Sequence, residues 1–199
     1  MVQTSAIVTD VTGNIAVIRF NRPAARNSLS IATLNELKEI ITSLTAREDL
    51  KALVFTGTED VFAAGADIAE LAQLDTELAF EFAKRGQLLF QAIADANQIT
   101  IAAINGYCMG GGLDLALACD IRIASPQAVF RHPGARLGII TGWGGTQRIP
   151  RLIGRPRSLE LFLTARLVTA DEALRVGLIT LQEAKPLDAA IRIARAASQ

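Results

Sequence analysis

The sequence has few of the residues that mark specialised classes of small protein. Its 199 residues include two cysteines, one histidine, one tryptophan and one tyrosine, and the formal net charge is zero. Cys108 and Cys119 lie in apolar stretches without CxxC or Cys/His spacing, which argues against a metal site and predicts reduced, buried thiols in a cytoplasmic protein. The lack of a basic excess argues against a nucleic-acid partner.

The sequence also lacks a convincing membrane segment. One stretch, 96–113, contains no charged residue, but its asparagines, glutamine and glycines make it too polar for a membrane-spanning helix. The first ten residues lack the charged region and apolar core of a secretory signal. We therefore expect no membrane partner.

The length and the apolar content fit one domain covering residues 1–199, because domains typically have about 100–200 residues. Strand-like and helix-like patterns alternate along the chain, which predicts an α/β fold with a mostly parallel sheet. Ser30 is placed to accept a hydrogen bond from the free amides of a helix beginning at Ile31. The predicted strands are a hairpin over 6–20 and the segments 52–58, 99–105 and 121–130. The predicted helices are 31–44, 68–74, 76–97, 113–119, 158–167, 170–178 and 187–197.

Two glycine-containing elements each follow a strand and precede a helix, at 61–68 and 109–118. Free amides at a helix N-terminus suit an anion, and two such turns could direct two amides at one oxygen. Glycines that serve only a tight turn are an equal alternative, with Asp67 a simple helix cap and Asp114 favoured by the helix dipole. A third glycine turn, 142–145, is predicted to join a strand to a helix.

Several segments together resemble the enoyl-CoA hydratase/isomerase (crotonase) family. The resemblance rests on these motifs, which occur in the family's order: FNRPAARNSLS (20–30), GADIAEL (65–71), INGYCMGGGLDLALACDIRIAS (104–125), GGTQRIPRLIG (144–154) and LTARLVTADEALRVGLI (163–179). It implies a spiral of stacked ββα units over 1–150 with flanking C-terminal helices over 151–199. This C-terminal part is shorter than is usual in the family.

The resemblance also implies a substrate and an assembly. The substrate is an acyl-CoA thioester of the kind met in fatty-acid metabolism, with CoA arriving as part of the substrate and no other cofactor. The usual assembly is a homotrimer or a dimer of trimers. By motif position the thioester oxygen lies between the backbone amides of Ala66 and Gly111. The family's CoA- and substrate-binding segments correspond here to Ala24, Arg26, Ala64, Asp67, Ile68, Ala69 and Gly112.

The chain departs from the family's hydratases at both carboxylate positions. Asp114 stands where they have a first glutamate, and Gly134 stands where they have a second. Asp114 is therefore a candidate acid or base, and His132, two residues before Gly134, is a second candidate because imidazole exchanges protons near neutrality. For both residues a structural role is the alternative.

These departures leave the reaction open. A lyase or isomerase acting on acyl-CoA thioesters is expected, with ordinary enoyl-CoA hydration disfavoured by Gly134. Isomerisation, decarboxylation, thioester hydrolysis and carbon–carbon bond cleavage are alternatives within the family. A non-catalytic acyl-CoA-binding or assembly subunit is an alternative of another class. Phe80, Leu89 and Trp143 are candidates for an acyl pocket, although apolar residues at helical spacing more often belong to the core.

Overall fold

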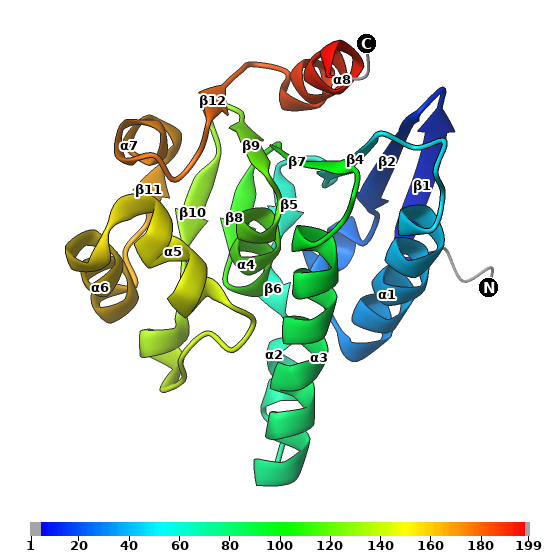
Figure 1. Cartoon of the computed structure of the whole chain (residues 1–199). Coiled ribbons are helices and arrows are strands. Elements are labelled where there is room, and N and C mark those ends of the chain that lie inside the picture. Colours follow the sequence, from blue (N-terminus) through cyan, green and yellow to red (C-terminus); the bar gives the residue numbers. More distant parts are fainter. Residues whose placement is uncertain (1–4, 198–199) are drawn as a thin grey trace.

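A six-stranded, mainly parallel sheet forms the larger layer of the fold (Figure 1). In the computed structural model, which describes residues 5–197, its strand order is β1-β2-β4-β7-β9-β12. The predicted hairpin is confirmed, because β1 and β2 pair antiparallel, and the other neighbours pair parallel. The strands are β1 (Ile7–Thr12), β2 (Ile15–Phe20), β4 (Ala52–Thr56), β7 (Ile99–Ile104), β9 (Ile121–Ala124) and β12 (Leu181–Gln182). Residues 1–4, which form part of the segment predicted to lack a signal, and 198–199 lie outside the described residues.

A smaller sheet lies beside the first and has the order β11-β10-β8-β5. Its strands are β5 (Val61–Ala63), β8 (Tyr107–Met109), β10 (Val129–Arg131) and β11 (Val168–Thr169), and a separate pair is formed by β3 (Ser28–Leu29) and β6 (Gly65–Ala66). The segment predicted as one strand or a strand pair over 121–130 is a pair divided between the sheets, with Pro126 between β9 and β10. The segment predicted to be helical over 151–199 also supplies β11 and β12.

The helices largely follow the predicted positions. They are α1 (Ile31–Thr45), α2 (Ile68–Leu71), α3 (Thr76–Ala94), α4 (Gly111–Ala118), α5 (Gly145–Ile153), α6 (Arg155–Thr164), α7 (Ala170–Val176) and α8 (Pro186–Ala196), with 3-10 turns η1 (Pro23–Ala25) and η2 (Gly134–Leu137). Ser30 Oγ accepts from the Thr33 amide at 3.2 Å, which confirms the predicted cap of α1. Among the described residues, no helix is long and apolar enough to cross a membrane.

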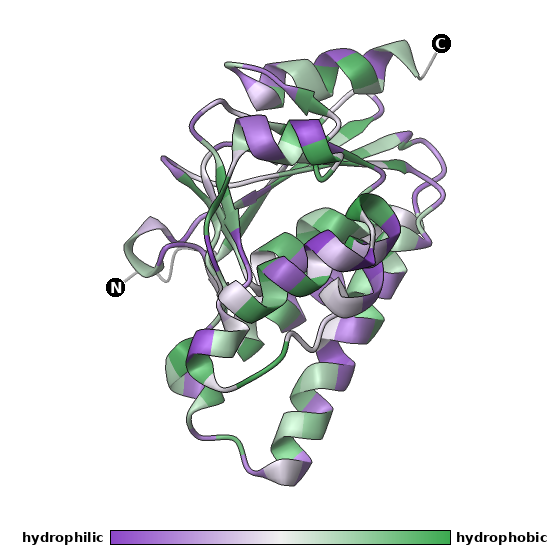
Figure 2. Cartoon of the chain, turned by 90° about the vertical axis from the view of Figure 1, so that its left-hand side faces the viewer, coloured by the Kyte–Doolittle hydropathy of each residue, from purple (hydrophilic) through white to green (hydrophobic). Residues whose placement is uncertain are grey.

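The larger sheet is apolar on both faces because each face is covered by helices. Val54 and Ile101 face α8, which contributes Ala189 to that small core. Phe55 and Ala102, their neighbours in sequence, face the main core formed with α1, α3 and α4. Figure 2 shows α8 over one face of this sheet and α3 on the opposite side. Side chains that alternate along a strand therefore divide between two apolar layers.

Two local predictions were wrong. The turn 142–145 does not join a strand to a helix, because η2 and a loop precede it. Phe80 belongs neither to the core nor to a pocket lining, since 66% of its surface is exposed on the outer face of α3. The buried face of α3 consists of Phe82, Gly86, Leu89, Phe90 and Ile93.

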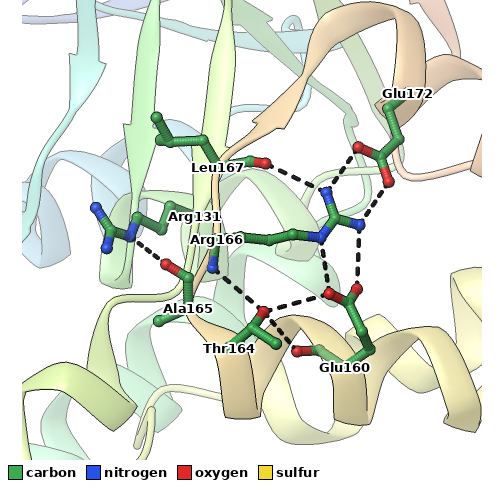
Figure 3. Close-up of polar contacts among 7 residues, drawn as sticks. All are labelled: Arg131, Glu160, Thr164, Ala165, Arg166, Leu167 and Glu172. Atoms are coloured by element: carbon green, nitrogen blue, oxygen red, sulfur yellow. Dashed lines mark hydrogen bonds and ion pairs between the residues drawn. The ribbon is translucent and has the colours of Figure 1, made fainter.

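An ion-pair network holds the C-terminal elements together (Figure 3). The guanidinium of Arg166 donates to the Glu160 carboxylate on α6, with Nε 2.7 Å from Oε1, and to the Glu172 carboxylate on α7 at 2.6 and 2.8 Å. Arg131, at the end of β10, donates to the carbonyl oxygen of Ala165. These contacts fix the chain between α6 and α7 against the smaller sheet.

Candidate active site

Two glycine-containing turns touch each other where β6 and β8 end. Gly65 has a φ of 92°, and a Cβ on it would lie 2.7 Å from the carbonyl oxygen of Met109 and 2.9 Å from the amide nitrogen of Gly111. Gly110, with φ 49° and ψ −119°, also has a backbone conformation that favours glycine. The missing side chains allow the backbone before Ala66 to approach the first turn of α4. The amide of Gly111 is one of those that have no acceptor within that helix.

These turns border a cavity of about 230 Å³. Its lining comes from residues within 64–74, 79–83, 110–114 and 132–143, and most of it is apolar. The lining residues whose side chains carry a hydroxyl or an ionisable group are Asp114, His132 and Thr141. The chemistry of the cavity therefore depends on three side chains and on the backbone of the two turns.

Asp114 places a fully buried carboxylate at the edge of this cavity. It lies in the first turn of α4, where its amide donates to the carbonyl oxygen of Gly110 at 3.0 Å. One carboxylate oxygen, Oδ2, accepts from the Thr141 hydroxyl. The other, Oδ1, lies 3.1 Å from His132 Nε2 and against Gly145, the first residue of α5. The carboxylate therefore lies at the N-terminal ends of two helices, α4 and α5.

His132 reaches Asp114 through the pairing of two short strands. In the parallel register of β8 and β10, Arg131 lies opposite Met109, so the next residue comes beside the glycine turn that opens α4. The imidazole is buried and packs against the ring of Phe162, with centroids 5.3 Å apart. Strand pairing thus joins two residues that are eighteen positions apart in the sequence.

The contact between the two side chains is a close approach without hydrogen-bond alignment. Asp114 Oδ1 and His132 Nε2 are both buried, and neither has a hydrogen-bond partner. A Cβ on Gly145 would lie 2.1 Å from Oδ1 and 3.0 Å from Nε2, so only a glycine leaves room for the pair on this side. Each buried polar atom left without a hydrogen bond lowers the stability of the fold by about 1–3 kcal/mol. Packing alone therefore does not explain why these two atoms are buried here.

Trp143 fixes the loop that carries Thr141. Its indole nitrogen donates to the carbonyl oxygen of Phe82 at 3.2 Å, and its ring packs against Phe82 and Phe90 with centroids 5.1 and 5.6 Å apart. A Cβ on Gly111 would lie 2.2 Å from the same indole ring. Trp143, one of the proposed pocket residues, therefore joins α3 to the glycine turn as well as lining the cavity.

Gly134, which the resemblance predicts to stand where the family's hydratases have a second glutamate, lines the cavity. A Cβ there would lie 2.6 Å from the carbonyl oxygen of Ile139, so the backbone leaves no room for a side chain. The amide of Ile139 also donates to the carbonyl oxygen of Gly134 at 3.0 Å, which closes the loop across η2. The loop is built around the glycine, and the glycine is not a truncated glutamate in an otherwise unchanged pocket.

The structure brings some of the predicted site residues together and leaves others outside. Those that line the cavity are Ala64, Ala66, Ile68, Gly111, Asp114 and His132. Gly112 does not line it, and a Cβ on Gly112 would lie 2.3 Å from the carbonyl oxygen of Ala63. Asp67 caps α2 by accepting from the Ala69 amide at 3.0 Å.

The predicted CoA-binding residues near the N-terminus lie on the surface next to the site. Ala24 and Arg26 are exposed in and after η1, and neither lines the cavity. The carbonyl oxygen of Arg26 accepts from the Ala64 amide at 3.1 Å, so this loop is tied to the turn that precedes Ala66. Any contact of these residues with CoA remains a prediction.

Sequence reasoning missed Thr141 and most of the apolar lining. The apolar residues that it missed are Leu71, Leu74, Ala79, Phe82, Ala83, Leu137, Ile139 and Ile140. No motif marks a threonine in a loop, and its role depends on the position of α5. Within residues 5–197, no group of three or more His, Cys, Asp or Glu side chains is arranged to hold a metal ion.

One protein family and two relatives match most of this chain. The family described as enoyl-CoA hydratase/isomerase matches this chain over residues 10–197. Crotonyl-CoA hydratase of Syntrophomonas wolfei is 42% identical over 174 residues, covering 87% of this chain and 67% of the relative. Short-chain-enoyl-CoA hydratase of Clostridium acetobutylicum is 40% identical over 174 residues, with the same coverage of 87% and 67%.

The likeness extends to three dimensions. The crystal structure of enoyl-CoA hydratase from Bacillus anthracis superposes with a TM-score of 0.93 at 37% identity, covering 98% of this chain and 77% of that structure. At this level of similarity the fold is shared over nearly the whole described chain.

Proposed function

This chain belongs to the enoyl-CoA hydratase/isomerase (crotonase) family of acyl-CoA-processing enzymes, and we propose that it stabilises a thioester enolate with the backbone amides of Ala66 and Gly111. Removing or adding a proton beside a thioester carbonyl places negative charge on its oxygen. A preorganised amide donor stabilises such an oxyanion by about 3–4 kcal/mol in the transition state. The observation that supports the proposal is the contact of the two glycine turns beside the cavity that Ala66 and Gly111 line.

The reaction type follows from the acid–base groups at hand. Two carboxylates that hold one water suit hydration, but this cavity has a single carboxylate, Asp114, and a glycine at position 134. We therefore propose that the enzyme is a lyase or isomerase acting on acyl-CoA, and we do not expect it to hydrate enoyl-CoA efficiently. Isomerisation, decarboxylation, thioester hydrolysis and carbon–carbon cleavage all use the same enolate.

A non-catalytic acyl-CoA-binding or assembly subunit is the competing proposal. The burial of Asp114 against His132 favours catalysis. An ionisable pair with unpartnered atoms in an apolar cavity destabilises the fold, and a protein that only binds acyl-CoA has no need of such a pair. In either case we propose that CoA enters with the substrate, that no other cofactor is needed, and that the chain works as a trimer or a dimer of trimers in the cytoplasm.

The test is a panel of enoyl-, β-keto- and malonyl-type CoA thioesters assayed for turnover and, separately, for binding. We expect turnover of at least one thioester, and we expect Asp114→Asn to lower its kcat by about 10²–10⁴-fold, the usual contribution of an acid–base group. Asp188→Asn is the matched control, because Asp188 is an exposed aspartate in the first turn of another helix, α8.

The outcomes separate the two proposals. Binding without turnover across the panel would favour the acyl-CoA-binding subunit. Absence of affinity for every CoA ester would contradict both. Equal losses in Asp114→Asn and Asp188→Asn would show that the effect does not arise in the cavity.

A further inference from the structure

The cavity holds an ionisable pair that its apolar surroundings do not explain. Asp114 and His132 have side chains that are 1% and 4% exposed, and their facing atoms, Oδ1 and Nε2, are 3.1 Å apart. Both atoms lack a hydrogen-bond partner. A purely structural pair would gain most from an aligned hydrogen bond, but these two polar atoms have none, although both residues line the cavity.

We propose that Asp114 and His132 act as one proton-transfer unit and that Thr141 is the positioning residue that orients it. This inference rests on the proposed function and deepens it, because it assigns the route of the proton. Without a second carboxylate to hold water, the unit serves proton transfer within the acyl chain. The substrate class is an acyl-CoA with an acidic hydrogen on the carbon next to the thioester carbonyl.

The proton transfer balances with the groups in the cavity. The bond between the α-carbon and its hydrogen breaks, and the electron pair moves into the enolate, whose oxygen lies at the amides of Ala66 and Gly111. The proton passes to the Asp114–His132 unit, whose total charge changes from −1 to 0. The unit then returns a proton, either the one it received or a solvent proton that has replaced it, to the α-carbon or, in an unsaturated chain, to the γ-carbon. Return of a solvent proton to the α-carbon is exchange, and delivery to the γ-carbon is double-bond isomerisation.

The geometry explains why the two groups must act together. The Thr141 hydroxyl donates a hydrogen bond to Oδ2 of Asp114, and the other carboxylate oxygen, Oδ1, faces the imidazole of His132. Gly145 closes the side of the pair that faces α5. The unit thus borders the cavity, and a proton gained on the imidazole is stabilised by the neighbouring carboxylate.

Deuterium uptake at the α-carbon of butyryl-CoA in D₂O, followed by NMR or mass spectrometry, measures this step without requiring knowledge of the net reaction. We expect the wild-type protein to exchange the α-hydrogen. His132→Gln and Asp114→Asn should each slow the exchange at least 100-fold, while butyryl-CoA binding changes less than threefold. The double variant should be about as slow as either single variant, because residues that act as a unit are not additive.

Thr141 is tested by conservative replacement. Thr141→Val removes the hydroxyl at nearly constant volume and should lower the exchange rate about 10-fold at saturating butyryl-CoA, with little change in KM. Thr141→Ser restores the hydroxyl and should recover most of the rate. Thr146→Val, on the first turn of α5 and outside the cavity lining, is the matched control and should keep the wild-type rate.

Each contrary outcome has a distinct meaning. A wild-type protein that binds no CoA ester contradicts the proposed function itself. A wild-type protein that binds butyryl-CoA without exchanging its α-hydrogen, or a His132→Gln variant with the wild-type rate, contradicts only this inference. Multiplicative losses in the double variant contradict action as one unit. If His132→Gln unfolds, recovery of exchange in His132→Ala by added imidazole decides the question, and a lack of recovery counts against the imidazole's role.

Discussion

At the residue scale, the site depends as much on missing side chains as on those present. A Cβ on Gly65 would meet the backbone of the neighbouring turn, one on Gly111 would meet Trp143, and one on Gly145 would meet Asp114. Each glycine therefore allows a contact that defines the cavity. Gly134 belongs to the same group, because a Cβ on it would meet the carbonyl oxygen of Ile139.

Gly134→Glu tests whether that position can regain a carboxylate. The added Cβ would lie 2.6 Å from the carbonyl oxygen of Ile139, so the loop must move. We expect a loss of about 1–3 kcal/mol in the free energy of unfolding, typical of overpacking, and no gain in hydration of crotonyl-CoA. Urea unfolding and a hydration assay measure the two effects.

The control for this substitution is Ala135→Glu, which adds the same side chain at the next, exposed position of η2. It should change the free energy of unfolding by less than about 0.5 kcal/mol, as surface substitutions usually do. If Gly134→Glu raised the hydration rate without loss of stability, the loop would have room that the structure does not show.

At the element scale, the Arg166 network joins α6 to α7 (Figure 3). Hydrogen bonds from Arg166 lower the pKa of both Glu160 and Glu172, and they raise the pKa of Arg166 further. Carboxylates with a lowered pKa stabilise the fold above their unfolded pKa, and this stabilisation is lost as the pH falls through the folded pKa. Because Arg166 is 39% exposed and Glu160 is 42% exposed, solvent screening limits the effect.

Arg166→Met should therefore lower the free energy of unfolding at pH 7 by about 1 kcal/mol or less. The difference from wild type should shrink as the pH falls below the ordinary glutamate value of 4.5. Guanidinium unfolding at a series of pH values measures it. Arg192→Met, which breaks one exposed pair with Glu183, is the control and should have a smaller effect. A difference that grew on acidification would contradict the assigned cause.

Long elements could be predicted from the sequence because their patterns are repeated. The strand over 99–105 and the helix after Ser30 fall within a residue or two of β7 and α1. The strands β5, β8 and β11 have two or three residues, too few to display a period of two. The smaller sheet could therefore not be predicted from local patterns. The β8–β10 register that brings His132 to Asp114 could not be predicted either.

At the scale of the whole molecule, the candidate residues could be predicted one by one, but their contacts could not. Asp114 and His132 were identifiable from motif position and residue chemistry. Their 3.1 Å approach depends on β8 pairing with β10, and the contact of Asp114 with Thr141 depends on where α5 begins. Such contacts join distant segments, and only the packed fold determines them.

The two thiols allow the integrity of this packed fold to be measured. Cys108 lies on β8, and Cys119 follows α4, so they lie on either side of the helix that carries Asp114. Both are fully or nearly fully buried. Burial raises the pKa of Cys119 to about 12 and the pKa of Cys108 well above its ordinary value. Because the thiolate is the nucleophile, both thiols should be unreactive in the folded protein.

We expect the folded protein at pH 8 to react with Ellman's reagent only as fast as the β8–α4 region opens, and two thiols to react at once in guanidinium. Since the folded pKa is raised, stability should be fully present below the unfolded thiol pKa of about 8.5 and should decline above it. Cys108→Ala and Cys119→Ala report on each position separately. Rapid labelling of either thiol in the folded protein would contradict the burial of this region. Slow labelling of both thiols at one common rate would show that β8 and α4, the helix that bears Asp114, open as one cooperative unit. Independent openings would instead give two different labelling rates.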